Sequence, residues 1–192
     1  INKRTKYDLV YMGILERDMG SDLAIRSLPT VLRRFPKTML HIIGGPEIHI
    51  ERMRAIVKKL DIEKFVVFHG IVPDNEKMAT IIRNCYIGLA PYRSFPNSKR
   101  WYGDAGKIRQ YTAAGLPVVT THVPPLGRYI VKKGAGIMTK DTVKSFSGGI
   151  LRLLSDDALY EKLSAGAINV SRDNTWENVY TKAFEDMKKM IE

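Results

Sequence analysis

The sequence predicts an α/β fold, with a doubly wound, mostly parallel, Rossmann-like sheet of about six strands and extra helices at the C-terminal end. Three features of the 192 residues indicate this fold. Short apolar runs alternate with longer amphipathic segments, the runs are bounded by glycine or proline, and only helical patterns follow residue 142. Nearly continuous apolar runs are typical of strands covered by helices on both faces of a parallel sheet.

The expected strands are short and rich in β-branched or other apolar residues. Glycine or proline beside each run supplies the break in regular structure that ends a strand. In chain order, the strands are expected at 9–12, 39–43, 65–68, 86–90 and 116–120, with a weaker one at 136–138.

The intervening segments place apolar residues at helical spacing. They predict helices at 21–34, 47–60, 74–83, 105–114 and 126–132. Pro29 lies inside the first of these and predicts a kink or a boundary there. Three further helices are expected at 142–154, 157–170 and 175–190.

The composition is that of a soluble globular protein with a surplus of positive charge. Lys and Arg number 31 against 20 Asp and Glu, and the net charge of +11 favours phosphate groups, nucleic acid or an anionic membrane face as partners. The single cysteine, Cys85, excludes a disulfide framework and a cysteine-based metal cluster. No apolar run approaches the roughly 18 residues that a transmembrane helix needs.

The length favours one domain over residues 1–192, because a domain typically holds roughly 100–200 residues. The chain begins with Ile1 rather than methionine, so we expect it to be a fragment of a longer protein.

Glycines follow several expected strands, at the edge where ligands bind in an open parallel sheet. Gly13, Gly44 and Gly70 come directly after the first three strands or within two residues of them. Glycine there lets a ligand approach backbone N–H groups without an intervening Cβ. Each alone is an ordinary turn, but together they indicate a ligand crevice.

The segment 92–109 carries five basic residues, four aromatic residues and one acidic residue. A loop this long inside a compact domain is usually functional or disordered. It leads through Gly103, Asp104 and Gly106 to Lys107 at the start of an expected helix, and such a helix N-terminus is suited to phosphate. A solvated basic loop is the alternative.

Histidines and metal-ligand patterns give little support for other chemistry. We expect His41 and His49 to be structural, whereas His69 and His122 follow expected strands and would face the crevice without a partner that makes either a general base. No His, Asp or Glu cluster has metal-ligand spacing, and neither a P-loop nor a GxGxxG pattern is present. We therefore expect no metal and no cofactor.

Several segments together resemble the C-terminal half of the group 1 (family 4) glycosyltransferases, which have the GT-B fold. In chain order they read GIL…MG, LHIIGG, VVFHGIV, LAPY, GKIRQYTAAGLPVV and TWENV. The most specific segment is 107–119, where many relatives read K-x-x-E-Y-x-A-A-G-x-P-V-V. The resemblance covers essentially the whole chain.

The resemblance implies a donor-binding domain for a UDP- or GDP-sugar, with retaining, hexosyl-type transfer to a glycan or lipid-linked acceptor in polysaccharide biosynthesis. In that family a separate N-terminal domain holds the acceptor, and we expect that domain to be absent from this chain. The fragment would then bind nucleotide but transfer little.

The resemblance also implies roles for individual positions. Gly13 and Ile14 would face the donor diphosphate, Gly44 would belong to the same donor-binding site, and backbone groups of Ile71 and Val72 would contact the base. Near the expected fourth helix, the phosphates or the transferred sugar would lie by Gly103, Asp104 and Gly106, and the ribose hydroxyls by Gln110.

The chain departs from the family pattern at several of these positions. Ile14 and Met19 stand where relatives often carry arginine and lysine, and Gln110 and Tyr102 stand where relatives carry glutamate. The cations that could compensate are Arg17, Lys99, Arg100 and Lys107. We hypothesise that Arg17 and Lys107 form the diphosphate clamp and act as the catalytic pair.

These departures keep other functions open. The main alternative is a non-catalytic GT-B-like module that binds a partner; nucleic-acid binding through the aromatic and basic loop is less favoured, as is a sugar-nucleotide epimerase of the same fold. We expect a cytoplasmic protein. Basic residues at 92–102 or on the last helix would favour the inner membrane face, although a solvated helix face explains them more simply.

Overall fold

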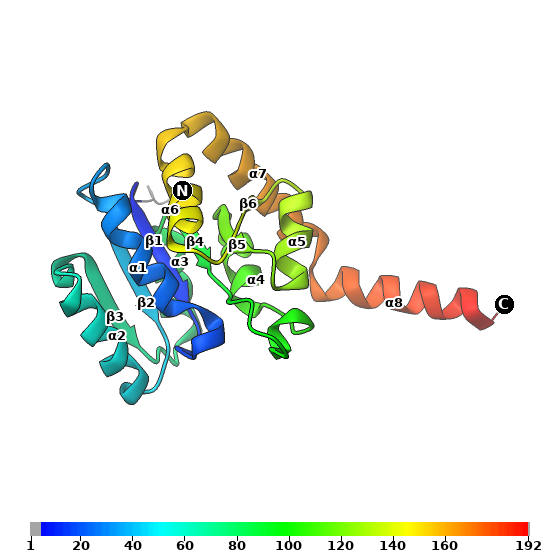
Figure 1. Cartoon of the computed structure of the whole chain (residues 1–192). Helices are drawn as coiled ribbons and strands as arrows, with labels where there is room; N and C mark the ends of the chain where they lie inside the picture. The colour runs from blue at the N-terminus through cyan, green and yellow to red at the C-terminus, as the bar shows by residue number, and fades with distance from the viewer. Residues whose placement is uncertain (1–4, 192) are drawn as a thin grey trace.

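The computed structural model describes residues 5–191 and confirms the predicted α/β class (Figure 1). One sheet contains six strands in the order β3-β2-β1-β4-β5-β6, and every strand pair in the described chain is parallel. The strands are β1 (Asp8–Met12), β2 (Met39–Ile43), β3 (Val66–Gly70), β4 (Ile87–Ala90), β5 (Val118–Thr121) and β6 (Gly136–Thr139).

Helices connect consecutive strands and extend the chain beyond β6. They are α1 (Ser21–Leu32), α2 (Glu47–Lys59), α3 (Asn75–Asn84), α4 (Gly106–Ala113), α5 (Pro125–Lys132), α6 (Val143–Ser155), α7 (Asp157–Asp173) and α8 (Trp176–Ile191). Three short 3-10 helices lie in the loops, η1 (Arg17–Met19), η2 (Glu63–Phe65) and η3 (Lys99–Trp101).

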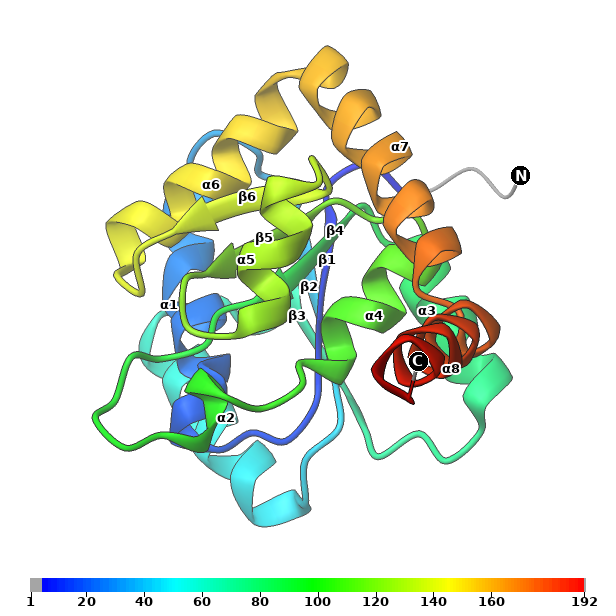
Figure 2. The same ribbon diagram turned by 90° about the vertical axis from the view of Figure 1, so that its right-hand side faces the viewer.

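The sheet separates two hydrophobic cores because side chains alternate between its faces. Leu9 and Tyr11 of β1 pack into one core with α1, α2 and α6, whereas Val10 packs into the other with α3, α4 and α5. Figure 2 shows α1 and α6 on one side of the strands and α3 and α4 on the other. Helix α7 contributes side chains to both cores, so it closes the fold at one end of the sheet.

Most expected elements are confirmed, with two differences. Helix α1 contains Pro29 and continues to Leu32, so of the kink or boundary expected at Pro29, the boundary was wrong. Proline removes only one N–H there, and the N–H of Arg33 donates to the Pro29 carbonyl in the last turn. Strand β3 extends to Gly70, so His69 lies within the strand, and its Nε2 is 3.0 Å from Nδ1 of His41 on β2.

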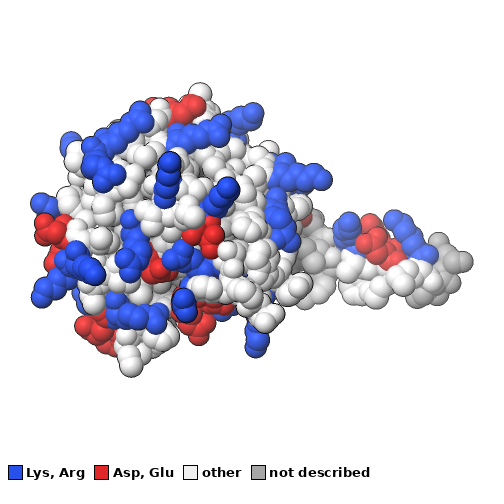
Figure 3. Space-filling view, viewed as in Figure 1, with Lys and Arg blue, Asp and Glu red and all other residues white. Residues whose placement is uncertain are grey.

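Helix α8 extends away from the rest of the molecule (Figure 1). Several of its apolar side chains are exposed, namely Val179, Tyr180, Phe184, Met187 and Met190. Figure 3 shows Lys and Arg side chains spread over one face of the protein, with fewer Asp and Glu side chains between them. Within the described residues, no helix combines the length and the apolar character needed to cross a bilayer.

Candidate functional site

The strand order reverses between β1 and β4, which are neighbours at the centre of the sheet. The chain leaves their carboxyl ends toward opposite faces, through the loop at 13–20 after β1 and the loop at 91–105 after β4. In open parallel sheets, ligands bind in the crevice at this switch point. These two loops are therefore the candidate site.

Two glycines allow the chain to turn closely at this edge of the sheet. Gly44 has φ +102°, and a Cβ there would lie 2.7 Å from the Gly13 carbonyl oxygen. Gly20 has φ +72°, and a Cβ there would overlap the carbonyl oxygen of Pro91. Both positions need glycine. The β1 loop can therefore pack directly against Pro91 after β4 and against Gly44 after β2.

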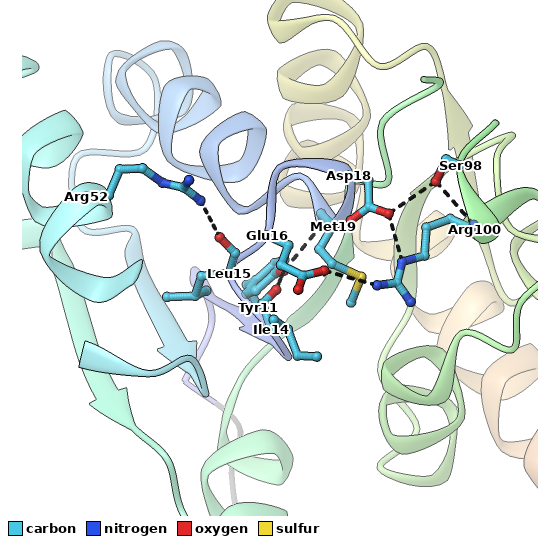
Figure 4. Close-up of polar contacts among 9 residues, drawn as sticks. All are labelled: Tyr11, Ile14, Leu15, Glu16, Asp18, Met19, Arg52, Ser98 and Arg100. Atoms are coloured by element: carbon cyan, nitrogen blue, oxygen red, sulfur yellow. Dashed lines mark hydrogen bonds and ion pairs between the residues drawn. The ribbon is translucent and has the colours of Figure 1, made fainter. Parts of the chain in front are cut away.

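Ion pairs hold the β1 loop on one side, and a hydrogen bond to its backbone holds it on the other (Figure 4). Arg100 of η3 places Nε 3.2 Å from Oδ2 of Asp18 and Nη2 3.4 Å from Oε2 of Glu16. The Ser98 hydroxyl also donates to Oδ2 of Asp18, at 3.2 Å. From the other side, Arg52 of α2 donates to the Leu15 carbonyl, at 2.6 Å.

A second network ties the start of the β4 loop to α1 and to the turn before α6. Arg93 binds the carboxylate of Asp22 at 2.8 Å and donates to the Asp141 carbonyl at 2.8 Å. The Asp141 carboxylate accepts bonds from the Ser94 N–H and hydroxyl, at 3.0 and 2.8 Å. Burial raises the pKa of Asp141, but the bonds from Ser94, together with its own backbone N–H and the charge of Arg93, leave the pKa below its ordinary value.

Lys107 of α4 lies in the interior between the two loops. Its side chain is buried, with Nζ 3.9 Å from the centroid of the Tyr11 ring and 4.9 Å from that of Tyr92. Nζ has no hydrogen-bond partner among the described residues. Burial lowers the pKa of Lys107 well below its ordinary value, Arg100 lowers it further, and Asp18 acts in the opposite direction.

Lys107 reaches the turn after β1. A Cβ on Gly13 would lie 3.3 Å from Cε and 3.4 Å from Nζ of Lys107. Among the described residues, no side chain caps the N-terminus of α1 or α4. Free N–H groups at helix N-termini attract anions, so the buried amine and both uncapped termini favour negative charge at the switch point.

The outer side of α4 borders a hollow of about 570 Å³ that reaches α5 and the junction of α7 and α8. Asp104, Gly106 and Gln110 line this hollow, and Asp104 forms an ion pair with Arg109 at 3.1 Å. The volume is within the range of small-molecule sites. Lys107 is not among the residues that line this hollow, although Gln110 is less than one helical turn away on α4.

The other predicted site residues are more scattered. Gly13, Ile14 and Gly44 lie together at the ends of β1 and β2, and Ile71 and Val72 follow β3 at the edge of the sheet. The Gly103 N–H donates to the Lys99 carbonyl, at 2.9 Å. Arg17 is exposed, with its guanidinium 4.6 Å from the centroid of the Phe95 ring.

Sequence reasoning missed the acidic side of the site. Glu16 and Asp18 alternate along the β1 loop, opposite a loop rich in basic residues, and this charge complementarity was the available signal. In the part of the chain that the structure describes, no group of three or more His, Cys, Asp or Glu side chains is placed to hold a metal ion.

Fold and site define a Rossmann-like α/β domain in which two loops meet at the switch point of its sheet. The model of the family "Glycosyl transferases group 1" matches residues 6–156. The chain belongs to the group 1 glycosyltransferases.

Known structures agree with this fold. The C-terminal domain of the group 1 glycosyltransferase LpcC from Francisella tularensis matches with a TM-score of 0.74 and 16% identity, over 89% of this chain and 87% of that chain. HepE from Anabaena, in complex with UDP, matches with a TM-score of 0.76 and 14% identity, over 96% of this chain and 49% of that chain.

A curated relative matches over a shorter stretch. The chitobiosyldiphosphodolichol beta-mannosyltransferase of Debaryomyces hansenii is 32% identical over 89 residues, which are 41% of this chain and 19% of that protein. The chain thus spans about a fifth of that enzyme and about half of HepE.

Proposed function

We propose that this domain binds the nucleoside diphosphate of a UDP- or GDP-sugar, with the diphosphate at the switch point beside Lys107. The observation that carries the proposal is the buried amino group of Lys107, which has no partner among the described residues and lies next to Gly13. The uncapped N-terminus of α4 is adjacent in the chain. The complex of HepE with UDP supports the same class of ligand.

The proposed mechanism is electrostatic. As the glycosyl bond breaks, negative charge grows on the departing diphosphate, and fixed positive groups stabilise that charge. Lys107 would supply a cation from the interior, and the α4 N-terminus would supply backbone N–H groups. Arg17 is exposed on the β1 loop, so its side chain would complete the clamp by leaving the Phe95 ring.

The remaining contacts follow the family resemblance. Ile71 and Val72 would contact the base with backbone groups, and Gln110 would bond the ribose from the edge of the hollow beside α4. Gln110 keeps the hydrogen bond of the usual glutamate but loses its charge, at a cost of about 1 kcal/mol. Binding would therefore rely more on the phosphates than on the ribose.

We infer that residues 1–192 act as one donor-binding domain and that a separate N-terminal domain holds a glycan or lipid-linked acceptor. The match to the C-terminal domain of LpcC supports the first part, and the name of the curated mannosyltransferase supports a lipid-linked acceptor. Retaining transfer and a cytoplasmic location belong to the same proposal. NMR of the product formed by the full-length enzyme would test retention at the anomeric carbon.

Peripheral contact with an anionic membrane is a further part of the proposal. Helix α8 carries exposed apolar side chains together with Lys182, Lys188 and Lys189, which suits an interfacial helix. Co-sedimentation with vesicles should then depend on anionic lipid. Equal co-sedimentation with neutral vesicles would contradict this contact.

Thermal unfolding with UDP, GDP, ADP and CMP tests the central proposal. A diphosphate at 100 times its Kd should add about 2.7 kcal/mol to the free energy of unfolding, whereas the monophosphate CMP should add less. Lys107→Met should abolish the effect, and Lys99→Met, on the exposed part of the β4 loop, should preserve it.

A non-catalytic module is the second candidate, favoured by Ile14, Met19, Tyr102 and Gln110 at positions where relatives carry charged residues. No shift with any of the four nucleotides would support that candidate instead.

A further inference from the structure

We propose that Lys107 is an uncharged amine in the empty site and takes up one proton when a diphosphate binds beside it. The inference rests on the proposed function, because it needs a diphosphate at the switch point. It adds that donor binding and protonation of this lysine are a single coupled event.

The surroundings of the Lys107 amino group disfavour its charged form. Nζ lies over the rings of Tyr11 and Tyr92, next to Gly13, and has no hydrogen-bond partner among the described residues. The Tyr11 hydroxyl is occupied, because it donates to the Ile14 carbonyl at 2.8 Å. A buried ammonium without hydrogen bonds is far less favourable than a buried neutral amine, and ring faces replace only part of the lost hydration.

Charged residues near Lys107 also affect its protonation. The positive charge of Arg100 on η3 disfavours a positive charge on Lys107, whereas the negative charge of Asp18 on the β1 loop favours it. Oδ2 of Asp18 already binds Arg100 and Ser98, so Arg100 neutralises part of the Asp18 charge. Tyr11 and Tyr92 stay neutral, because burial raises both of their pKa values. Burial and the positive charge of Arg100 together outweigh Asp18 and hold the pKa of Lys107 well below its ordinary value.

Diphosphate changes this balance. Its negative oxygens beside Gly13 would supply both a counter-charge and hydrogen-bond acceptors for the amino group, which raises the pKa of Lys107 again. A proton then passes from the solvent to Nζ and forms a third N–H bond there, and no bond to carbon or phosphorus forms or breaks. Between the pKa values of the empty and occupied sites, affinity should weaken about tenfold for each unit of rising pH.

Calorimetry of UDP binding to the chain measures this proton directly. The titration is made at about pH 8, where a phosphate with a second pKa near 6 is already ionised, in HEPES and in Tris. The two buffers differ in ionisation enthalpy, so the difference between the observed binding enthalpies gives the number of protons taken up. We expect about one proton per UDP.

Two variants sharpen the test. Lys107→Arg replaces the amine by a group that is always protonated, so it should bind UDP without proton uptake. Lys99→Arg changes an exposed lysine of the same loop and should keep the wild-type uptake. If Lys107→Arg does not fold, the dependence of the wild-type Kd on pH still tests whether a proton is taken up on binding.

The outcomes separate the two proposals. Binding of UDP by the wild-type chain without proton uptake, and with a Kd independent of pH, overturns this inference and leaves the proposed function intact. Equal uptake by the wild type and by Lys107→Arg assigns the proton to another group and also overturns the inference. Failure of UDP, GDP and ADP to bind overturns both proposals.

Discussion

Arg100 and Asp18 join the two loops that follow β4 and β1, with Nε of Arg100 3.2 Å from Oδ2 of Asp18 (Figure 4). The two residues are 82 positions apart in the sequence. Both side chains are only about a quarter exposed, at 28% and 25%. The pair therefore fixes the β4 loop against the β1 loop.

This pair should contribute measurably to stability. We expect a double-mutant cycle with Asp18→Asn and Arg100→Gln to give a coupling energy of about 1 kcal/mol, the upper end for ion pairs near the surface. Urea unfolding of the wild type, both single variants and the double variant measures it. Lys99→Gln, in the neighbouring exposed position, should change the free energy of unfolding by less than about 0.5 kcal/mol. A coupling energy near zero would show that the loops are held by other contacts.

Lys107→Met should make the empty protein more stable. Methionine matches the lysine side chain as far as Cε and removes a buried amine without a partner among the described residues, so the free energy of unfolding should rise by about 1 kcal/mol. Nucleotide-induced stabilisation should be lost in the same variant. Urea unfolding with and without UDP measures both effects. A clear loss of stability in the empty variant would mean that the amino group supports the fold.

Gly20→Ala should strongly destabilise the protein. Its φ of +72° disfavours a side chain, and the new Cβ would overlap the Pro91 carbonyl, so we expect a loss of about 3 kcal/mol. Gly148→Ala is the matched control, because Gly148 lies in α6 with open space around its would-be Cβ. That change should stabilise the protein by about 0.5–1 kcal/mol. Thermal unfolding of both variants measures these changes. Similar Tm values would contradict the close contact between Gly20 of the β1 loop and Pro91 of the β4 loop.

Stability should fall in mildly acidic solution because of His69. Burial, and then His41 and Lys77, lower the pKa of His69 below its ordinary value of 6.5. The unfolded chain therefore binds a proton at higher pH than the folded chain does. This contribution to stability is complete above pH 6.5 and is lost as the pH falls through 6.5 toward the lower pKa of the folded state.

His69→Gln tests that assignment. Glutamine cannot be protonated in this range, so the variant should lose about 0.5 kcal/mol less than the wild type on acidification, after allowance for solvent screening. Urea unfolding between about pH 5 and pH 8 provides the comparison. Parallel pH profiles for the two proteins would rule out His69 as the source.

The sequence predicted the sheet well because its signals are local. Short apolar runs bounded by glycine or proline located all six strands of the described chain within a few residues. The pairing of His41 with His69 was not predictable in this way. It depends on the parallel register of β2 and β3, which places His41 opposite Val67, two residues before His69 on the same face.

The site was predictable only in part, because only some of its features produce local sequence patterns. Glycines at strand ends and Lys107 at a helix start are local patterns, and the structure places Lys107 against Gly13. The burial of the amino group and the pairing of Asp18 with Arg100 depend on contacts between distant segments. The roles of Ile71, Val72 and Gln110 remain predictions.

A crystal structure of the chain with bound UDP, or with whichever diphosphate stabilises it most, tests the central claim most directly. We expect a phosphate oxygen within about 3 Å of Nζ of Lys107 and close to the first N–H groups of α4. A nucleotide bound away from the switch point, with the amino group still enclosed by Tyr11 and Tyr92, would contradict it.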